Sequence, residues 1–455
     1  MPQLMPDLAA PLTPTDPFAP AEPPAAPTAQ PNAQARTAPP AAPAAEQAAE
    51  QAAALPHPSA AEGDGARLDP AEDSGGESGA PDAHSTAPAV LIRYAELLRF
   101  TTEVFTARGL PAARAATAAA ALCYGDLTGL TSHGLVNLTR LYLPLLDEGR
   151  ADPLAEPETL ADRGAAVLRD DRRALGLWAA PDAMDLAIER AGTYGIGLVS
   201  VRGATHLGCA GFHTLRAARR GVIGVLAANC GRQRIARPPG GRLAMLGTNP
   251  LSVAAPAGAH PPFVLDMSTT AVPTGRIRAA ARAGQRVPAG WLAAADGSPV
   301  TDPAAFDRGE AHLLWLGSGP QTGSYKGYGL GLVVEVLGAL LAGAGLGPDR
   351  AALDGDGGPG GRDDDIGYLA LAIAPGALRD GADFERDAGG LFGALLDCPP
   401  VDPARPVGYP GRPEAERAER QLREGVRLAP ARFQELTDLA AATGLTAPRP
   451  IGGRP

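Results

Sequence analysis

The sequence predicts an α/β fold preceded by a long disordered tail, and three observations support this. Short apolar runs typical of buried strands alternate with stretches of helical spacing from about Leu91 onward. Residues 1–88 consist mostly of Ala, Pro, Ser, Gly and acidic residues. The 455-residue chain is 45% hydrophobic, which is enough for a sizeable core. We therefore divide the chain into a tail, residues 1–88, and a folded body, residues 89–455.

The tail also differs from the body in charge. It carries twelve Asp or Glu residues against Arg36 and Arg67, and this net charge of −10 equals the formal charge of the whole chain. Such a segment cannot bury enough apolar surface to offset its ordering entropy, so we expect it to be disordered. The body is then close to neutral and has no basic run. This balance argues against a nucleic-acid or membrane-surface partner.

The first part of the body is predicted to be helical. Apolar positions recur at helical spacing between Leu91 and Leu122, and the break at Gly109-Leu110-Pro111 separates two amphipathic helices. A loop of small and polar residues is expected at 125–134. A third helix is predicted from about Leu138 to Leu146.

The middle and the end of the body supply the strands. Residues 196–201 and 222–227 are predicted to be buried strands, and the helix expected at about 211–220 makes them a β-α-β unit. Further strands are predicted at 251–255, 263–266 and 368–373. Two Gly- and Asp-rich stretches, around 280–311 and 347–367, are expected to be long loops. No internal repeat is present.

The longest apolar stretch and the cysteines bear on location. Tyr328–Gly347 is about as long as a membrane span, but Glu335 lies near its middle and Lys326 precedes it, so we expect a buried core helix. No secretory signal is recognisable at the N-terminus. The cysteines are far apart and form no C-x-x-C pair, which favours a reducing, cytoplasmic location without disulfides or zinc: Cys123, Cys209, Cys230 and Cys398.

Common phosphate-binding and hydrolase motifs are missing. No G-x-G-x-x-G opens a helix after a strand, no P-loop is present, and no G-x-S-x-G surrounds Ser132. One lysine stands out instead, because the chain has 39 arginines and Lys326 alone. A GC-rich coding bias replaces Lys by Arg wherever any positive charge suffices. Lys326 is therefore expected to be needed as a compact ammonium group.

Two of the seven histidines are candidates for proton transfer. His133 and His206 both occupy turns with glycine and small polar neighbours, where an imidazole that titrates near neutral pH is usually held. Ser132 could orient His133 or hold a substrate oxygen. The others are expected in the tail, in surface loops, or on a helix as a packing or surface residue: His57 and His84, His260 and His312, and His213, respectively.

Five motifs resemble, in order and spacing, the malate/L-lactate dehydrogenase-like oxidoreductases, a family that includes ureidoglycolate dehydrogenase, diketogulonate reductase and piperideine-2-carboxylate reductase. They are residues 131–134, 197–211, 246–250, 263–269 and 325–329. The resemblance covers about residues 91–447, including Tyr409-Pro410-Gly411. It implies a non-Rossmann nicotinamide-binding α/β fold. It also implies a homodimer whose active site lies near the subunit interface.

The resemblance further implies roles for individual residues. His133 and His206 are the acid/base candidates, together with Ser132. Contacts to NAD or NADP are implied for a second set: Asp266, Met267, Ser268, Lys326, Gly411 and Cys230. Substrate contacts are implied for a third: Asn137, Arg140 and Asn249. No metal is implied.

Three positions depart from the family pattern. Asn137 stands where members commonly carry an arginine that can grip a substrate carboxylate bidentately. Arg276 replaces a lysine, and Arg412 replaces the glutamate of a Pro-Gly-Glu turn. Asn137 matters most, because an uncharged amide cannot supply the charge-assisted fork.

These observations together predict an NAD(P)-dependent oxidoreductase that moves hydride between nicotinamide and a 2-hydroxy or 2-oxo acid or a related carbonyl compound. The alternative within enzymes is a reductase of a cyclic imine or of a larger biosynthetic intermediate, which Asn137 favours. A third hypothesis is a non-catalytic scaffold that works through its Pro-rich tail. The two histidines and the lone lysine argue against it.

Overall fold

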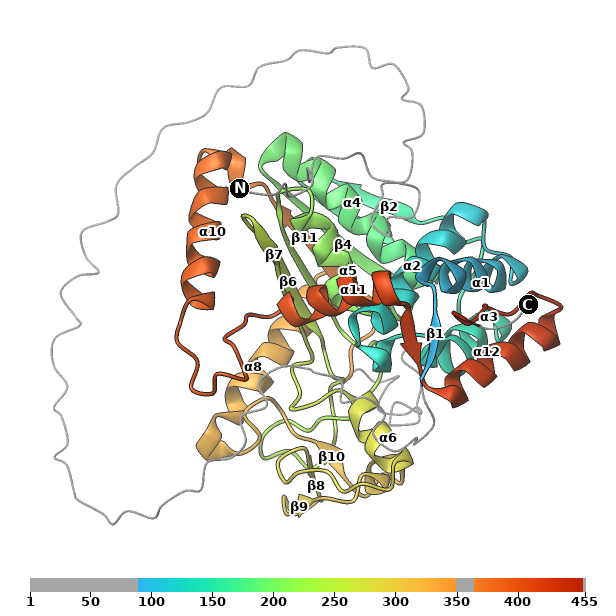
Figure 1. The fold of residues 1–455 in the computed structure, drawn as a ribbon. Helices are drawn as coiled ribbons and strands as arrows, with labels where there is room; N and C mark the ends of the chain where they lie inside the picture. The colour runs from blue at the N-terminus through green and yellow to red at the C-terminus, as the bar shows by residue number, and fades with distance from the viewer. Residues whose placement is uncertain (1–88, 349–363, 453–455) are drawn as a thin grey trace, which may run out of the picture. The chain divides into compact units, whose positions relative to one another are not determined.

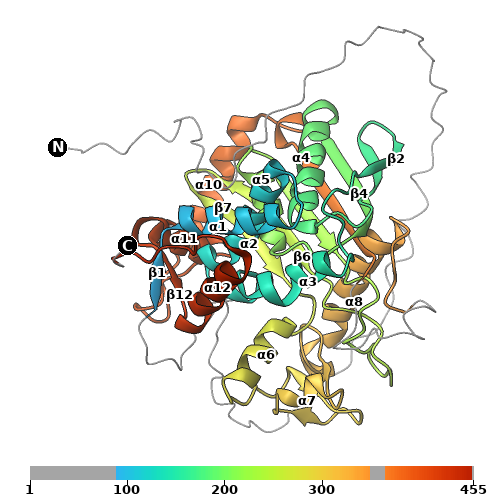
Figure 2. The same cartoon turned by 90° about the vertical axis from the view of Figure 1, so that its right-hand side faces the viewer.

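The computed structural model describes residues 89–348 and 364–452, and Figures 1 and 2 show their arrangement. The predicted α/β fold is confirmed: a seven-stranded mixed sheet is flanked by helices. The predicted disorder of residues 1–88 lies outside the described residues, as does most of the loop expected at 347–367.

A strand from the end of the chain lies in the middle of the main sheet. β11 pairs with β4 on one side and β5 on the other, antiparallel to both, so the strands of the predicted β-α-β unit are parallel but not adjacent. This order differs from that of an all-parallel Rossmann sheet. In order across the sheet the strands are β2 (Glu158–Asp162), β3 (Ala166–Asp170), β4 (Ile196–Ala204), β11 (Ile366–Ile373), β5 (Ile223–Ala228), β6 (Leu251–Ala257) and β7 (His260–Met267).

The strand directions bring the candidate loops to one edge of this sheet. Ala204 at the end of β4 lies opposite Ile366, and Ala228 at the end of β5 lies opposite Tyr368. Leu251 at the start of β6 lies opposite Met267 at the end of β7. The loops after β4, β5 and β7 and the loop before β6 therefore all leave from the same edge.

Helices cover the sheet and form a helical layer beside it. α4 (Gly176–Tyr194) and α5 (Ala210–Ala218) pack on the strands, while α1 (Tyr94–Ala107) and α2 (Ala112–Thr128) pack on each other. The C-terminal segment returns to this layer, because β1 (Val90–Ile92) pairs with β12 (Val426–Leu428). The remaining elements there are η1 (Thr131–His133), η2 (Leu138–Tyr142), α3 (Leu143–Asp147), α11 (Arg412–Glu424) and α12 (Pro430–Thr443). α10 (Gly381–Leu396) instead packs on β6 and β7, next to η5 (Pro375–Ala377).

The stretch predicted as a long loop at 280–311 is instead part of a small lobe with its own core, drawn at the bottom of Figures 1 and 2. Its elements are too short to show a hydrophobic period, which explains the error. They are α6 (Thr274–Arg282), β8 (Leu292–Ala293), β9 (Pro299–Val300), α7 (Ala304–Asp307) and β10 (His312–Leu313). Buried Ile277, Leu292, Phe306, Leu313 and Trp315 hold it together.

Three further predictions were wrong. The apolar stretch 328–347 is not a buried core helix: α8 (Ser324–Val334) follows η3 (Pro320–Thr322), continues as a π-helix, η4 (Glu335–Leu340), and exposes Val333, Val336 and Leu340. Within the described ranges, no helix is long and apolar enough to cross a membrane.

Residues 125–128 extend α2 rather than opening a loop, and His260 and His312 lie on β7 and β10 rather than in surface loops. His213 is a packing residue as predicted, fully buried with Nε2 2.8 Å from the Leu207 carbonyl oxygen.

A buried ion pair supports the first strands of the sheet and yields a stability prediction. Asp171 is fully buried. Its carboxylate accepts a 2.7 Å hydrogen bond from Arg169 and a 2.9 Å hydrogen bond from the Tyr368 hydroxyl. Asp171→Ala would leave the buried guanidinium without this carboxylate and should lower the free energy of unfolding by about 3–5 kcal/mol. Urea unfolding followed by circular dichroism measures this.

The control is Asp162→Ala, which breaks the surface ion pair with Arg190. It should leave the unfolding midpoint nearly unchanged, because solvent screens exposed pairs. Equal effects of the two substitutions on the free energy of unfolding would contradict a stabilising role of the buried Asp171–Arg169 ion pair.

Candidate active site

The Ser132–His133 turn is held against the end of α2 by two close contacts. The Asp126 carboxylate accepts a 2.6 Å hydrogen bond from the Leu135 N–H. Gly125 and Gly134 approach so closely that a Cβ on Gly125 would lie 2.7 Å from the Gly134 Cα, so no larger residue fits at Gly125. The turn therefore has one position relative to the helix.

His133 and Ser132 form a local pair within this turn. The Ser132 Oγ lies 3.0 Å from the His133 Nδ1. Gly275, near the start of α6, packs against Ser132, because a Cβ there would lie 2.8 Å from the Ser132 Cβ. The small lobe thus forms one wall beside the pair.

His206 follows β4 and faces His133. Their ring centroids are 6.2 Å apart, and the ring planes are inclined by 21°. The structure therefore brings the two candidate histidines together. The Tyr142 hydroxyl lies 2.8 Å from the His206 Nδ1, and the Gly208 N–H donates to the same nitrogen over 3.2 Å.

Both imidazoles are neutral near pH 7. Desolvation by burial lowers the pKa of His206 to about 4. Desolvation, together with the neighbouring His206, lowers the pKa of His133 to about 4 as well. A neutral imidazole can accept a proton or hold a substrate oxygen by hydrogen bonding.

The predicted substrate residues are not all at this pair. Asn137 is close, but its side-chain amide donates a 2.8 Å hydrogen bond to the Ser132 carbonyl oxygen and so stabilises the turn. Arg140 is exposed on η2. Asn249 is fully buried and donates to the Glu335 carboxylate over 2.7 Å and to the Gly331 carbonyl oxygen over 3.0 Å, so its amide group ties β6 to the α8–η4 helix.

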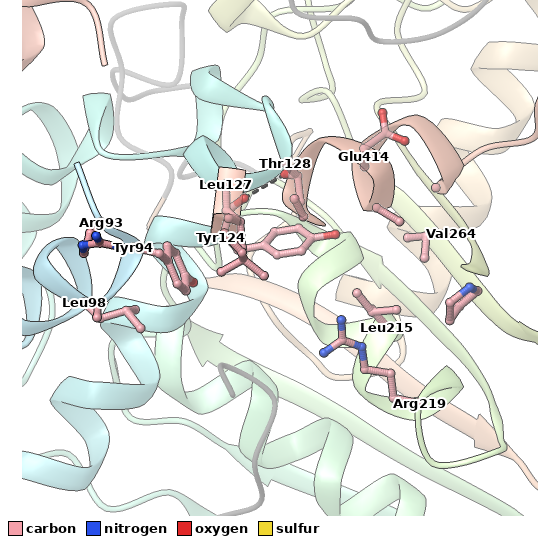
Figure 3. Close-up of a pocket in the computed structure, with 16 residues that line it drawn as sticks. Arg93, Tyr94, Leu98, Tyr124, Leu127, Thr128, Leu215, Arg219, Val264 and Glu414 are labelled. Atoms are coloured by element: carbon pink, nitrogen blue, oxygen red, sulfur yellow. Dashed lines mark hydrogen bonds between the residues drawn. The ribbon is translucent and has the colours of Figure 1, made fainter. Parts of the chain in front are cut away.

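A pocket of about 510 Å³ lies between α1, α2, α5, β7 and α11. In Figure 3, the side chains of Tyr124 from α2 and Arg219 from the end of α5 border the pocket. Val264 of β7 and Glu414 of α11 line it as well. Gly411 lines it too, and its φ of +95° and a notional Cβ only 2.6 Å from the Val264 nitrogen make glycine necessary there. Neither candidate histidine lines this pocket.

Asp266 stands beside this pocket, two residues beyond Val264 on β7. Its carboxylate accepts a 2.7 Å hydrogen bond from the Gly211 N–H at the start of α5. Desolvation raises the pKa of Asp266 to about 6, the Gly211 hydrogen bond opposes this rise, and Glu414 adds to it. Gly411 thus lines the pocket, whereas Asp266 lies two residues beyond the lining residue Val264 on β7.

The other predicted cofactor residues lie at the sheet edge or beyond it. Cys230 follows β5 and contacts the Thr248 hydroxyl over 3.4 Å, and Met267 and Ser268 stand half-buried at the end of β7. Lys326 lies exposed on α8, with its Nζ 5.9 Å from the Tyr325 ring centroid. In the part of the chain that the structure describes, no cluster of three or more His, Cys, Asp or Glu side chains could hold a metal ion.

Sequence reasoning missed two residues of this site. The sequence predicts a loop around Asp126, and around Tyr142 it predicts only a helix, from about Leu138 to Leu146. A polar residue on an Ala-rich helix, only seven positions before the candidate histidine, was a usable indication for Asp126. Nothing local identifies Tyr142, because its contact with His206 spans 64 residues.

Comparison of the sequence with known proteins identifies a matching family and individual relatives. The family model described as malate/L-lactate dehydrogenase matches residues 92–437. The chain is 31% identical to an L-lactate dehydrogenase of Cupriavidus necator over 351 residues, which is 76% of this chain and 96% of the relative. It is 32% identical to a Δ1-pyrroline-2-carboxylate/Δ1-piperideine-2-carboxylate reductase of Pseudomonas putida over 297 residues, covering 65% and 82% of the two chains.

A solved structure shows the same fold. The crystal structure of malate dehydrogenase from Entamoeba histolytica matches with a TM-score of 0.74 and 26% identity, over 79% of this chain and all of that one. Sequence and fold therefore agree, and the chain belongs to the malate/L-lactate dehydrogenase family of NAD(P)-dependent oxidoreductases.

Proposed function

We propose that the chain transfers hydride between a nicotinamide cofactor and a 2-hydroxy or 2-oxo acid. The observation that carries this proposal is the pair of half-buried, neutral imidazoles, His133 and His206, facing each other beside the Ser132 hydroxyl. Two nearby groups that exchange or hold a proton, in a partly desolvated site, suit the oxidation of an alcohol.

We propose that one end of the cofactor, its base and phosphates, binds in the pocket of Figure 3. Its volume lies in the range of small-molecule sites, about 300–1,000 Å³. Tyr94, Tyr124 and aliphatic side chains would hold a flat base, while Arg93 and Arg219 bring positive charge for phosphates. Gly411 allows close approach at its wall. When bound, nicotinamide supplies the carbon that accepts or donates hydride.

The chain's own residues bind the substrate and take up or return its proton. In the oxidising direction, neutral His133 accepts the proton of the substrate hydroxyl, and Ser132 and His206 hold the substrate oxygen by hydrogen bonds. In the reducing direction His133 returns the proton. Lys326, Cys230, Met267 and Ser268 remain proposed cofactor contacts. Arg140 and Asn249 remain proposed substrate residues, although Asn249 is buried and its amide N–H groups donate to Glu335 and Gly331.

A cyclic imine is the second candidate substrate, and Asn137 favours it. Its amide is engaged with the Ser132 carbonyl oxygen, so this position offers no charged fork to a carboxylate. The similarity to an imine reductase of Pseudomonas putida supports a C=N substrate on separate grounds, because the substrates in the name of that relative carry a carboxylate themselves.

We also propose a homodimer in the reducing cytoplasm. The α8–η4 helix exposes a row of apolar side chains, and α10 exposes more; these are Leu332, Val333, Val336, Leu340, Leu341, Leu391 and Leu395. An exposed apolar surface of this kind is typical of a protein interface. All four cysteines are free thiols, which suits a reducing compartment.

The proton role of His133 is tested by His133→Ala. Removing the imidazole should lower kcat on the order of 10²–10⁴-fold while the affinity for NADH or NADPH stays within about twofold, because His133 does not line the cofactor pocket. Stopped assays with a panel of 2-oxo acids, 2-hydroxy acids and cyclic imines give kcat, and fluorescence titration gives the cofactor affinity. An unchanged kcat would assign the proton to His206 instead.

The role of Asn137 is tested by Asn137→Arg. A guanidinium there would supply the charge-assisted contact worth about 1.5–3 kcal/mol, so kcat/KM for pyruvate and oxaloacetate should rise about ten- to a hundredfold. Arg140→Ala is the matched control. Strong wild-type turnover of these acids that Arg140→Ala abolishes, with no gain in Asn137→Arg, would show that Arg140 already binds the carboxylate.

The dimer is tested by Val336→Glu on the exposed face of η4, where the wild-type side chain is 50% exposed. Light scattering should give about twice the chain mass of 46.2 kDa for the wild type and a shift toward the monomer for the variant. Leu154→Glu changes another exposed apolar residue, on the loop before β2, and should leave the mass unchanged. A monomeric wild type would overturn the proposal.

A further inference from the structure

The two ring nitrogens of His206 have different surroundings. Nδ1 accepts a 3.2 Å hydrogen bond from the Gly208 N–H, and the Tyr142 hydroxyl oxygen lies 2.8 Å from the same nitrogen. A backbone N–H can only donate, so Nδ1 acts as an acceptor and carries no proton. In a neutral imidazole the proton must then be on Nε2.

The backbone around His206 makes this arrangement rigid. Gly208 has a φ of +79°, and a Cβ there would lie 2.9 Å from the Leu177 Cδ2 and 3.6 Å from the Tyr142 hydroxyl oxygen. Glycine therefore allows the chain to turn back so that its own N–H reaches the imidazole of His206. The turn and Tyr142 together enclose Nδ1.

Tyr142 is held as firmly as its partner. It ends the π-helical turn η2, its side chain is fully buried, and its ring meets the His206 ring edge-on, with centroids 5.8 Å apart and planes inclined by 63°. The hydroxyl faces an unprotonated nitrogen at hydrogen-bond distance, so it donates. A π-helical turn is an unusual local structure that recurs at functional sites, and here it places a tyrosine beside the site histidine.

We propose that Tyr142 is a positioning residue that, with the Gly208 N–H, holds His206 as its neutral Nε2–H tautomer. His206 then presents a hydrogen-bond donor to the substrate, and the proton of the reaction is carried by His133 alone. This division of roles rests on the proposed function. The tautomer itself does not, because it is set by the protein without substrate.

The tautomer can be measured on the full chain without ligand. We expect long-range ¹H–¹⁵N spectra of the histidine-labelled protein at pH 7 to show a neutral His206 ring whose Nδ1 has the shift of an unprotonated nitrogen. The spectrum of His206→Gln, which lacks these signals, identifies them. A His206 ring that is protonated on Nδ1, or evenly mixed between tautomers, would overturn the proposal even if the enzyme is active.

Tyr142→Phe separates positioning from packing, because it removes the hydroxyl and keeps the ring. We expect the Nδ1 signal to move and kcat to fall about two- to tenfold, the effect of losing one hydrogen bond, with little change in KM. Tyr368→Phe is the matched control: it also removes a buried hydroxyl, which donates to Asp171, and should leave the His206 signals unchanged. Equal responses of the His206 signals to both variants would overturn the positioning role.

The donor role has its own test in conservative variants of His206. Glutamine carries an N–H donor at about the place of Nε2 but cannot take up a proton near neutral pH. His206→Gln should therefore keep at least about a tenth of the wild-type kcat and exceed His206→Ala at least about tenfold. Equal activities of the two variants would overturn the donor role. If no nicotinamide-dependent turnover is found, the proposed function fails, while the spectra still decide the tautomer.

Discussion

The 2.6 Å hydrogen bond between the Leu135 N–H and the Asp126 carboxylate is the contact on which the site depends. Without it, only the close approach of Gly125 and Gly134 would hold the Ser132–His133 turn against α2. The helix end is itself held by the C-terminal segment, because Gln421 of α11 donates to the carbonyl oxygens of Asp126 and Leu127 and accepts from the Arg427 N–H in β12. The C-terminal segment thus supports His133 although it contributes no group to the proton transfer.

Burial governs the chemistry of the groups so positioned. The same desolvation that lowers the pKa of His133 and His206 raises that of Asp126 and of Asp266 to about 6. In each case burial disfavours the charged form, and hydrogen bonds from backbone N–H groups partly restore it for the carboxylates. Keeping four titratable groups in such places costs stability, which indicates that position and protonation state matter here more than stability does.

The elements and residues that sequence reasoning predicted correctly are those that depend on local pattern. Strands such as β4 and β11 were visible as apolar runs, and His133 and His206 stood out by their small, polar neighbours. The features that sequence reasoning did not predict are contacts distant in sequence. The position of β11 between β4 and β5, the burial of Asn249 against Glu335, and the Tyr142–His206 contact all join segments that no local pattern connects. The α8–η4 helix was misjudged because an apolar face that is left exposed has the same composition as one that is buried.

The neutral state of His133 also bears on the choice between substrates. Oxidation of a hydroxy acid needs a proton acceptor, which neutral His133 provides at pH 7. Reduction of a 2-oxo acid needs a donor, and charging an imidazole whose pKa has fallen from 6.5 to about 4 is disfavoured by roughly 3 kcal/mol relative to one in water. A bound carboxylate would offset part of this, but Asn137 leaves that carboxylate without the usual guanidinium. A protonated cyclic imine already carries the proton, so its reduction needs no donor from the enzyme. Accepting a proton in the oxidising direction forms the same disfavoured imidazolium, so the lowered pKa opposes proton transfer in both directions of hydroxy-acid chemistry, whereas iminium reduction does not require that charge.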